Sequence, residues 1–260
     1  MFNPSTAQQA LHMVLAAYAA TGLAVAGIHA ALLVRRPSSP LHRAALSIAL
    51  AVGAPAAVLQ PVSGDFSART VAQWQPTKLA ALEGQFQTEV GAPLRIGGWP
   101  DERAARTRFA IEIPRGLSLL AFHDPSATVR GLTAFPRDLW PPVAPVHASF
   151  QVMVALGTIM AVVSLWALVS VARRRDLASN RPLLRALAVI APFGFIATEA
   201  GWTVTEVGRQ PWVVQGVMRT ADSVTPMPGL IVPMLTFTLL YLGLGAIVVA
   251  LVRAMVRETA

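Results

Sequence analysis

The sequence predicts an all-α transmembrane protein: a five-helix membrane bundle with a long, partly ordered outer loop between the second and third spans. Of its 260 residues, 54% are hydrophobic and only 13% are charged, a composition typical of multi-span membrane proteins and not of soluble globular ones. Five apolar stretches approach or exceed the roughly 20 residues that cross a hydrocarbon core. These stretches cover residues 10–34, 42–62, 148–172, 183–206 and 229–252.

Arginines beside these stretches predict how the chain is oriented. They occupy the short connections after the first and third spans and the C-terminal tail: Arg35, Arg36, Arg43, Arg173, Arg174, Arg175, Arg181, Arg185, Arg253 and Arg257. Because positively charged loops stay on the cytoplasmic side, we expect the N-terminus outside and the C-terminus in the cytoplasm. The net charge of +8 is then explained by membrane orientation, with no nucleic-acid partner.

This reading divides the chain into three parts. Residues 1–62 hold the first two spans, residues 63–147 form the outer loop, and residues 148–260 hold the last three spans. The loop is too long for a simple connector. Ser63, Gly64 and Asp65 predict a turn at its start, and residues 78–87 predict a short helix. We expect the proline-rich stretches near 93–100 and 134–145 to be irregular, so that the loop forms a partly ordered cap.

A polar stripe follows one face of the fourth span. Glu199, Trp202, Glu206 and Arg209 recur at intervals of three or four residues, and two carboxylates seven residues apart share a helix face. A carboxylate in or near a bilayer is costly and is therefore read first as functional. The stripe predicts a site that holds a cofactor or moves protons. An ion pair between Glu206 and Arg209, with Trp202 in the interfacial aromatic belt, is the alternative.

His12 and Met153 lie in the first turns of the first and third spans, at the outer ends of both. Antiparallel topology then brings them to the same membrane depth. A His/Met pair is the axial ligand set of low-spin electron-transfer haem. A lone histidine near a membrane end is, however, more often an interfacial polar residue, and methionine is common core filler. The residues by themselves leave both interpretations open.

Lys78 and Glu83 are the candidate proton-handling residues of the outer loop. Five residues correspond to about 140° around a helix, so each side chain faces its own partner. A protonated lysine and a carboxylate beside a hydroquinone would hydrogen-bond its oxygens and accept its protons; a solvated charged face is the alternative. The remaining histidines, His29, His42, His123 and His147, are interpreted as interfacial polar residues. The absence of cysteine excludes disulfides and thiolate metal sites.

Four strings together resemble one family. They are FNPSTAQQALHM near the N-terminus, QPTKLAALE from Gln75 to Glu83, SFQVMVALG from Ser149 to Gly157, and EAGWTVTEVGRQPW from Glu199 to Trp212. All resemble subunit I of the cytochrome bd quinol oxidases, and the short outer loop resembles the short-loop, cyanide-insensitive branch. The chain is similar to a carboxy-terminal portion of that subunit and lacks counterparts of the first helices.

The resemblance implies a quinol oxidase that reduces O2 to water in the bacterial cytoplasmic (inner) membrane. His12 and Met153 would ligate a low-spin haem b. Glu206 would be an axial ligand in a high-spin pair of haem b and haem d, or a third haem b, with Glu199 deeper on the same face. Trp202 and Arg209 would support the macrocycles and propionates.

The resemblance also implies the quinol site and the partners. Gln75, Lys78 and Glu83 would belong to the quinol-binding loop. Gln151 stands where many family members have an arginine. Expected partners are subunit II, the missing N-terminal portion of subunit I, membrane lipid, quinol and O2. The alternative is a non-catalytic haem-binding or assembly-type membrane fragment that is inactive without the missing N-terminal half.

Overall fold

The computed structural model describes residues 5–259, and its long apolar helices confirm the predicted helical membrane fold. Five helical segments within the described residues are long and apolar enough to span a membrane. They are α1 (Thr6–Arg35), α2 (Pro40–Trp74), α5 (Val143–Ala172), the pair α6 (Arg181–Ile190) and α7 (Phe193–Glu206), and α8 (Ile231–Thr259). The chain divides into two compact units at residue 220, and α8 belongs to the second unit while the other four spans belong to the first.

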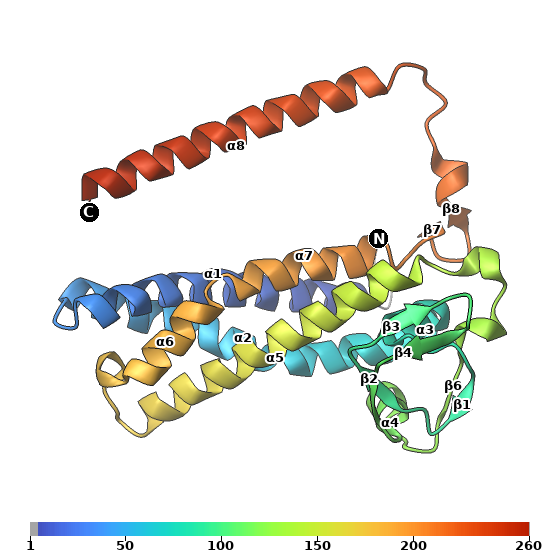
Figure 1. The fold of residues 1–260 in the computed structure, drawn as a ribbon, viewed down its shortest axis with the longest axis horizontal. Coiled ribbons are helices and arrows are strands. Elements are labelled where there is room, and N and C mark those ends of the chain that lie inside the picture. Colours follow the sequence, from blue (N-terminus) through green and yellow to red (C-terminus); the bar gives the residue numbers. More distant parts are fainter. Residues whose placement is uncertain (1–4, 260) are drawn as a thin grey trace. The chain divides into compact units, whose positions relative to one another are not determined.

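Small residues let α1 and α2 pack closely along their length (Figure 1). A Cβ atom added at Gly53 would lie 2.8 Å from the backbone carbon of Gly22, so neither position has room for a side chain. Close approach through small residues is the usual way in which membrane helices associate. At its start α2 is favoured by Pro40 in the first turn and by Ser39, whose hydroxyl accepts from the His42 N–H at 3.5 Å.

The fourth span is two helices joined near Pro192. In α6 the leucines at 183, 184 and 187 and Ile190 are buried and form one apolar stripe. Pro192 follows, and its ring cannot continue the helical hydrogen bonds, so α7 begins afresh at Phe193. Gly194 then allows α7 to cross α1, because a Cβ atom there would lie 2.4 Å from the Cα atom of Ala20. The stretch predicted as one helix, residues 183–206, is thus interrupted once.

The predicted turn at Ser63, Gly64 and Asp65 is wrong, because α2 runs through these residues to Trp74. The hydroxyl of Ser63 donates to the Gln60 carbonyl at 3.0 Å, within the same helix. Hydroxyl side chains can bond to the carbonyl one turn earlier instead of starting a turn. After Gln75 the chain enters α3 (Pro76–Glu83), which ends at Gly84 and is shorter than the helix predicted over 78–87.

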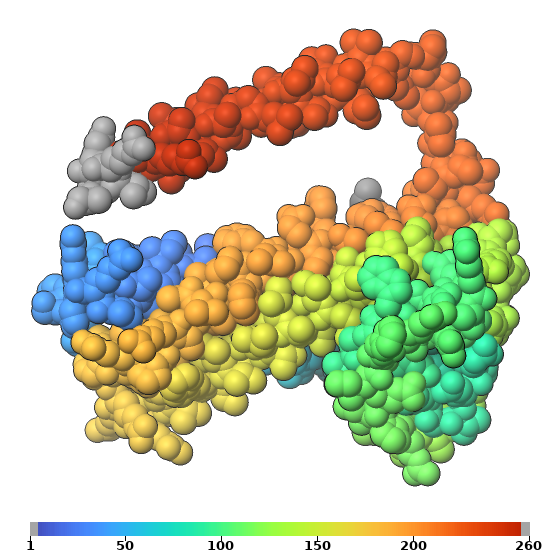
Figure 2. All heavy atoms as spheres, in the orientation of Figure 1, coloured from blue at the N-terminus to red at the C-terminus, as the bar shows by residue number. Residues whose placement is uncertain are grey.

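The rest of the outer segment is ordered. It contains three two-stranded antiparallel sheets, α4 (Gly116–Phe122) and two short 3-10 turns before α5 begins at residue 143, five residues earlier than predicted. The strand pairs are β1 (Glu89–Val90) with β6 (Thr128–Val129), β2 (Leu94–Ile96) with β5 (Ile111–Ile113), and β3 (Trp99–Asp101) with β4 (Arg106–Arg108). The stretch near 93–100 that was predicted to be irregular therefore holds two strands. Figure 2 shows this segment, in teal to green, packed as one body against the start of α5.

Candidate functional site

The candidate site residues gather at one end of the first unit. There α1 and α5 begin, α2 and α7 end, and the outer segment covers them (Figure 1). Helix α1 packs on α2 and α7, and α5 packs on α2, α3 and α7. His12, Met153, Lys78 and Glu206 are therefore carried by elements that meet at the same end of the bundle, as antiparallel topology predicts.

His12 is fixed by two side chains of α2. Its Nδ1 lies 2.7 Å from Ser63 Oγ, and its Nε2 lies 3.1 Å from the Gln60 side-chain nitrogen. The Gln60 amide nitrogen can only donate, so Nε2 accepts and Nδ1–H donates to Ser63. This is the tautomer of a metal-binding histidine, whose other N–H is held by a neighbour. Gln60 would have to move away from Nε2 for an iron to bind there.

Met153 lies on α5 against a glycine of α7. A Cβ atom added at Gly201 would lie 3.2 Å from Met153 Sδ, so the thioether occupies the space that a side chain at Gly201 would fill. One turn after Met153, Gly157 has no described atom within 4 Å of such a Cβ atom. The His12 tautomer, whose Nε2 carries the lone pair that now accepts from Gln60, and the small residues beside Met153 fit the haem that the sequence predicts at this pair, once Gln60 moves away.

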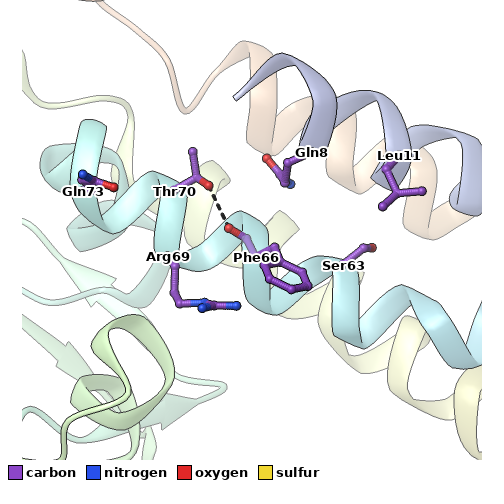
Figure 3. Close-up of a pocket in the computed structure, with 7 residues that line it drawn as sticks. All are labelled: Gln8, Leu11, Ser63, Phe66, Arg69, Thr70 and Gln73. Atoms are coloured by element: carbon purple, nitrogen blue, oxygen red, sulfur yellow. Dashed lines mark hydrogen bonds between the residues drawn. The ribbon is translucent and has the colours of Figure 1, made fainter. Parts of the chain in front are cut away.

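A cavity of about 280 Å³ lies beside His12, between α1 and α2 (Figure 3). It shares Ser63 with the contacts of His12. Its wall combines apolar and polar side chains, among them Phe66 and Arg69, whose guanidinium carbon lies 4.6 Å from the Phe66 ring centre. The full set of lining residues is Gln8, Leu11, Ser63, Phe66, Arg69, Thr70 and Gln73. Among these described residues the cavity therefore adjoins the proposed haem ligand and not the quinol-binding residues.

Lys78 joins the polar stripe of α7. Arg209 pairs with Glu206 at 2.5 Å, so the ion pair considered for these two residues is present. A Cβ atom at Gly208 would lie 3.2 Å from Lys78 Cε, which shows how closely the lysine approaches the α7 end. Burial and, to a smaller extent, the positive charge of Arg209 lower the pKa of Lys78 to about 8, while Glu206 partly opposes the shift. Lys78 is therefore half-buried beside a charged pair and is not part of a solvated face.

Glu83 is a buried acid at the last turn of α3. Its side chain is almost wholly enclosed, and Oε2 has no hydrogen-bond partner among the described residues. Burial raises the pKa of Glu83 to about 8, and the nearby positive charge of Arg95 partly offsets this. Lys78 and Glu83 thus face different partners, as their spacing predicts, and neither forms a solvated surface.

The other predicted residues have simpler surroundings. Gln75 lies at the junction of α2 and α3, where its N–H bonds the Val71 carbonyl at 2.8 Å. Glu199 and Trp202 are exposed on the described part of α7, with 62% of Trp202 accessible. Residues 2–4 of the N-terminal string lie outside the described residues.

Four important residues were missed or misjudged in the sequence. His147 was interpreted as interfacial, yet it is fully buried, because both its ring nitrogens find backbone carbonyls. Arg95 anchors the β2 strand with ion pairs to Glu112 at 3.0 Å and Glu89 at 3.6 Å. Gln60 and Ser63 hold His12; Gln60 lies within the predicted span, whereas Ser63 could have been placed on the same helix only if that helix had been extended beyond residue 62.

Comparison with known proteins agrees with the fold and the motifs. A family described as Cytochrome bd terminal oxidase subunit I matches residues 1–260. The chain is 39% identical over 255 residues to the putative cytochrome bd menaquinol oxidase subunit I of Bacillus subtilis (strain 168), covering 95% of this chain and 57% of that protein. It is 30% identical over 286 residues to the cytochrome bd-II ubiquinol oxidase subunit 1 of Escherichia coli (strain K12), covering 85% of this chain and 55% of that protein.

A solved structure of a bd oxidase is also similar to this chain. The bd oxidase from Geobacillus thermodenitrificans matches with a TM-score of 0.85 and 33% sequence identity, over 100% of this chain and 60% of that one. The chain thus spans somewhat more than half the length of these relatives. Because the family match extends over its whole length, the chain belongs to the cytochrome bd terminal oxidase subunit I family.

Proposed function

We propose that this multi-pass membrane chain carries the electron-input site of a bd-type quinol oxidase that reduces O2 to water. The observation that carries the proposal is the pair of buried ionisable groups in α3, at the start of the outer segment. The pKa of Lys78 is lowered to about 8, and the pKa of Glu83 is raised to about 8. Groups with a pKa close to the pH at which an enzyme works are suited to transfer protons. Relatives are named as menaquinol and ubiquinol oxidases, which supports quinol as the substrate.

Each group has a distinct task in this proposal. The ionised form of Glu83 accepts a hydroxyl proton from quinol, and its unpartnered Oε2 is the acceptor atom. The Lys78 ammonium donates a hydrogen bond to a quinol oxygen. Gln75, at the hinge between α2 and α3, completes the quinol-binding set. With this end of the bundle facing outward, the protons that quinol loses leave on the outer side.

His12 and Met153 would hold a low-spin haem b, which when bound supplies a one-electron acceptor for the quinol. Ser63 accepts from the His12 Nδ1–H, which leaves Nε2 as the ligand atom once Gln60 moves away from it. Gly201 leaves the space in which the Met153 thioether packs. The two residues act by binding and orienting the group, at the same end of the bundle as Lys78 and Glu83.

The oxygen-reducing side is proposed at the α7 stripe. Glu206 would help to hold a high-spin pair made of haem b with haem d or a further haem b, which when bound would supply the site of O2 reduction. Arg209, at 2.5 Å from Glu206, would balance the charge of the carboxylate and of propionates, with Trp202 beside the macrocycles. Glu199 lies deeper on the same helix as a proton-handling residue. Subunit II, the N-terminal portion of subunit I and membrane lipid are the partners that would complete this side.

The test is Glu83→Gln in the assembled oxidase, measured as quinol oxidation against pH. In the wild type we expect the rate to rise from pH 6 toward pH 8 as Glu83 ionises, and to fall above it as Lys78 loses its proton. Glu83→Gln removes the base, so the rate at saturating quinol should fall by about 100-fold and lose its rising limb. Glu102→Gln, the same substitution elsewhere in the outer segment, should leave the rate and its pH profile unchanged. A wild-type rate and pH profile in Glu83→Gln would overturn the quinol site.

Absence of quinol oxidation in the wild-type assembly, with haem bound, would instead favour a non-catalytic haem-binding or assembly role.

A further inference from the structure

Two side chains of α5 bind the backbone of the outer segment. His147 is fully buried, with Nδ1 2.7 Å from the Leu82 carbonyl and Nε2 3.1 Å from the Gly97 carbonyl. Gln151 donates from Nε2 to the Arg95 carbonyl at 3.0 Å and accepts at Oε1 from the Gly97 N–H at 3.0 Å. Residues four apart lie on the same helix face. One face of α5 therefore holds both the end of α3 and the turn after β2.

The two backbone pieces held in this way flank Glu83 and Arg95. The Leu82 carbonyl, just before Glu83, bonds His147, and the Gly84 carbonyl, just after it, accepts from Thr107 Oγ1 at 2.7 Å. Carbonyls at a helix end have no partner within the helix, so these side chains fix the last turn of α3. Gly84 has φ of 60°, and an added Cβ atom would lie 2.5 Å from Thr107 Oγ1.

Arg95 is held at its backbone by Gln151 and at its guanidinium by acidic and amide groups. The guanidinium pairs with Glu89 and Glu112 and bonds Gln85, which is itself fully buried. The charge of Arg95 acts on the carboxyl of Glu83. The position of the Arg95 backbone therefore helps set the electrostatic surroundings of the buried acid.

Helix α5 also carries Met153, two residues after Gln151. The same rigid helix thus holds the outer segment at 147 and 151 and presents the thioether at 153. Functional groups placed on rigid elements are positioned more accurately than groups on loops. A neutral imidazole has one N–H and donates to one carbonyl at a time, so the two bonds from Gln151 keep the turn attached whichever carbonyl His147 serves.

We propose that His147 and Gln151 form a clasp that positions Glu83 and Arg95 relative to Met153. They are positioning residues of quinol oxidation, and the inference rests on the proposed function. Both polar atoms of the Gln151 side chain bind the outer segment. The clasp sets the geometry of the quinol site without touching quinol.

The test compares Gln151→Leu and Gln151→Asn with Gln87→Leu in the assembled oxidase in membranes. Gln151→Leu removes both bonds, Gln151→Asn shortens the side chain so that it cannot span both, and Gln87 is an exposed glutamine of the same segment. We expect the quinol KM to rise between about twofold and tenfold for both Gln151 variants, as for one or two lost hydrogen bonds. The low-spin haem spectrum should keep its wild-type band position.

Trypsin supplies a second measurement that does not depend on turnover. The segment contains exposed arginines at 103, 106 and 108, and a loosened clasp should speed cleavage there by a similar factor. A merely structural role would lower the amount of assembled protein while leaving KM and cleavage per assembled molecule unchanged. If Gln151→Leu does not assemble, Gln151→Asn decides by the same two measurements.

Wild-type KM and cleavage rates in an assembled Gln151 variant would overturn the clasp. If the wild-type complex does not oxidise quinol, the proposed function fails, and the cleavage rates alone judge the clasp. Faster cleavage in both Gln151 variants than in Gln87→Leu then supports the clasp as an anchor of the outer segment. Equal cleavage rejects it.

Discussion

At the scale of single residues, the buried Glu83 links stability to pH. Burial holds its pKa at about 8 in the folded state, against 4.5 for a solvent-exposed glutamic acid. Between these values the folded protein binds a proton that the unfolded chain lacks, so the free energy of unfolding falls as pH rises. The buried acid therefore lowers stability at higher pH, as is common for functional groups.

Glu83→Gln should therefore stabilise the assembled protein toward pH 8. Glutamine keeps the shape of the protonated acid and has no charge to bury, so its stability should depend less on pH between 5 and 8. The measurement is the Tm of the detergent-solubilised complex at several pH values in that range. Parallel slopes for wild type and Glu83→Gln would contradict the raised pKa. Lys78 makes the free energy of unfolding rise with pH, but only above about pH 8, where the folded protein loses a proton that the unfolded chain keeps.

The residue types of the site could be read from the sequence, but their partners could not. His12, Met153, Lys78 and Glu83 stand in recognisable strings, and the spacing of Lys78 and Glu83 shows that they face different neighbours. The contacts of His147 and Gln151 join positions 50 or more residues apart. No local pattern signals them, because backbone carbonyls are identical at every residue.

At the scale of elements, the long spans were predictable and their ends were not. Hydropathy locates the apolar core of α1, α2 and α5. Polar residues then extend a helix beyond the membrane wherever they find partners within it, as the hydroxyl of Ser63 does. The prolines of the outer segment predict only partial order, yet short strand pairs such as β2 with β5 order it. Arg95 opposite Glu112 contributes a cross-strand charge pair.

The close crossing of α1 and α2 should be sensitive to added volume at Gly53. A Cβ atom at Gly53 would lie 2.8 Å from the backbone carbon of Gly22, so Gly53→Leu forces the two helices apart. Overpacking of this kind costs about 1–3 kcal/mol. The shift would move Gln60 and Ser63 away from His12, so we expect both a lower Tm and loss of low-spin haem. Ala51→Leu, at an exposed position on the same helix, is the matched control. Equal haem content in both variants would contradict this role of the crossing.

At the scale of the whole molecule, four spans and an ordered outer segment bring the proposed electron-input groups to one end of the first unit. The stripe of α7 with Glu199 and Trp202 remains exposed within the described part of that unit. The chain spans about 57% of the Bacillus relative. The electron-input side draws all its named residues from this sequence.

The central claim is that Met153 and His12 together bind the haem that receives quinol electrons. Its most direct test is the reduced-minus-oxidised spectrum of membranes containing the assembled complex with Met153→Leu, a change of similar volume at a packed position. Met153→Leu should abolish the low-spin signal and quinol-driven reduction while leaving the Tm close to that of the wild type. An unchanged low-spin spectrum in Met153→Leu would contradict the claim.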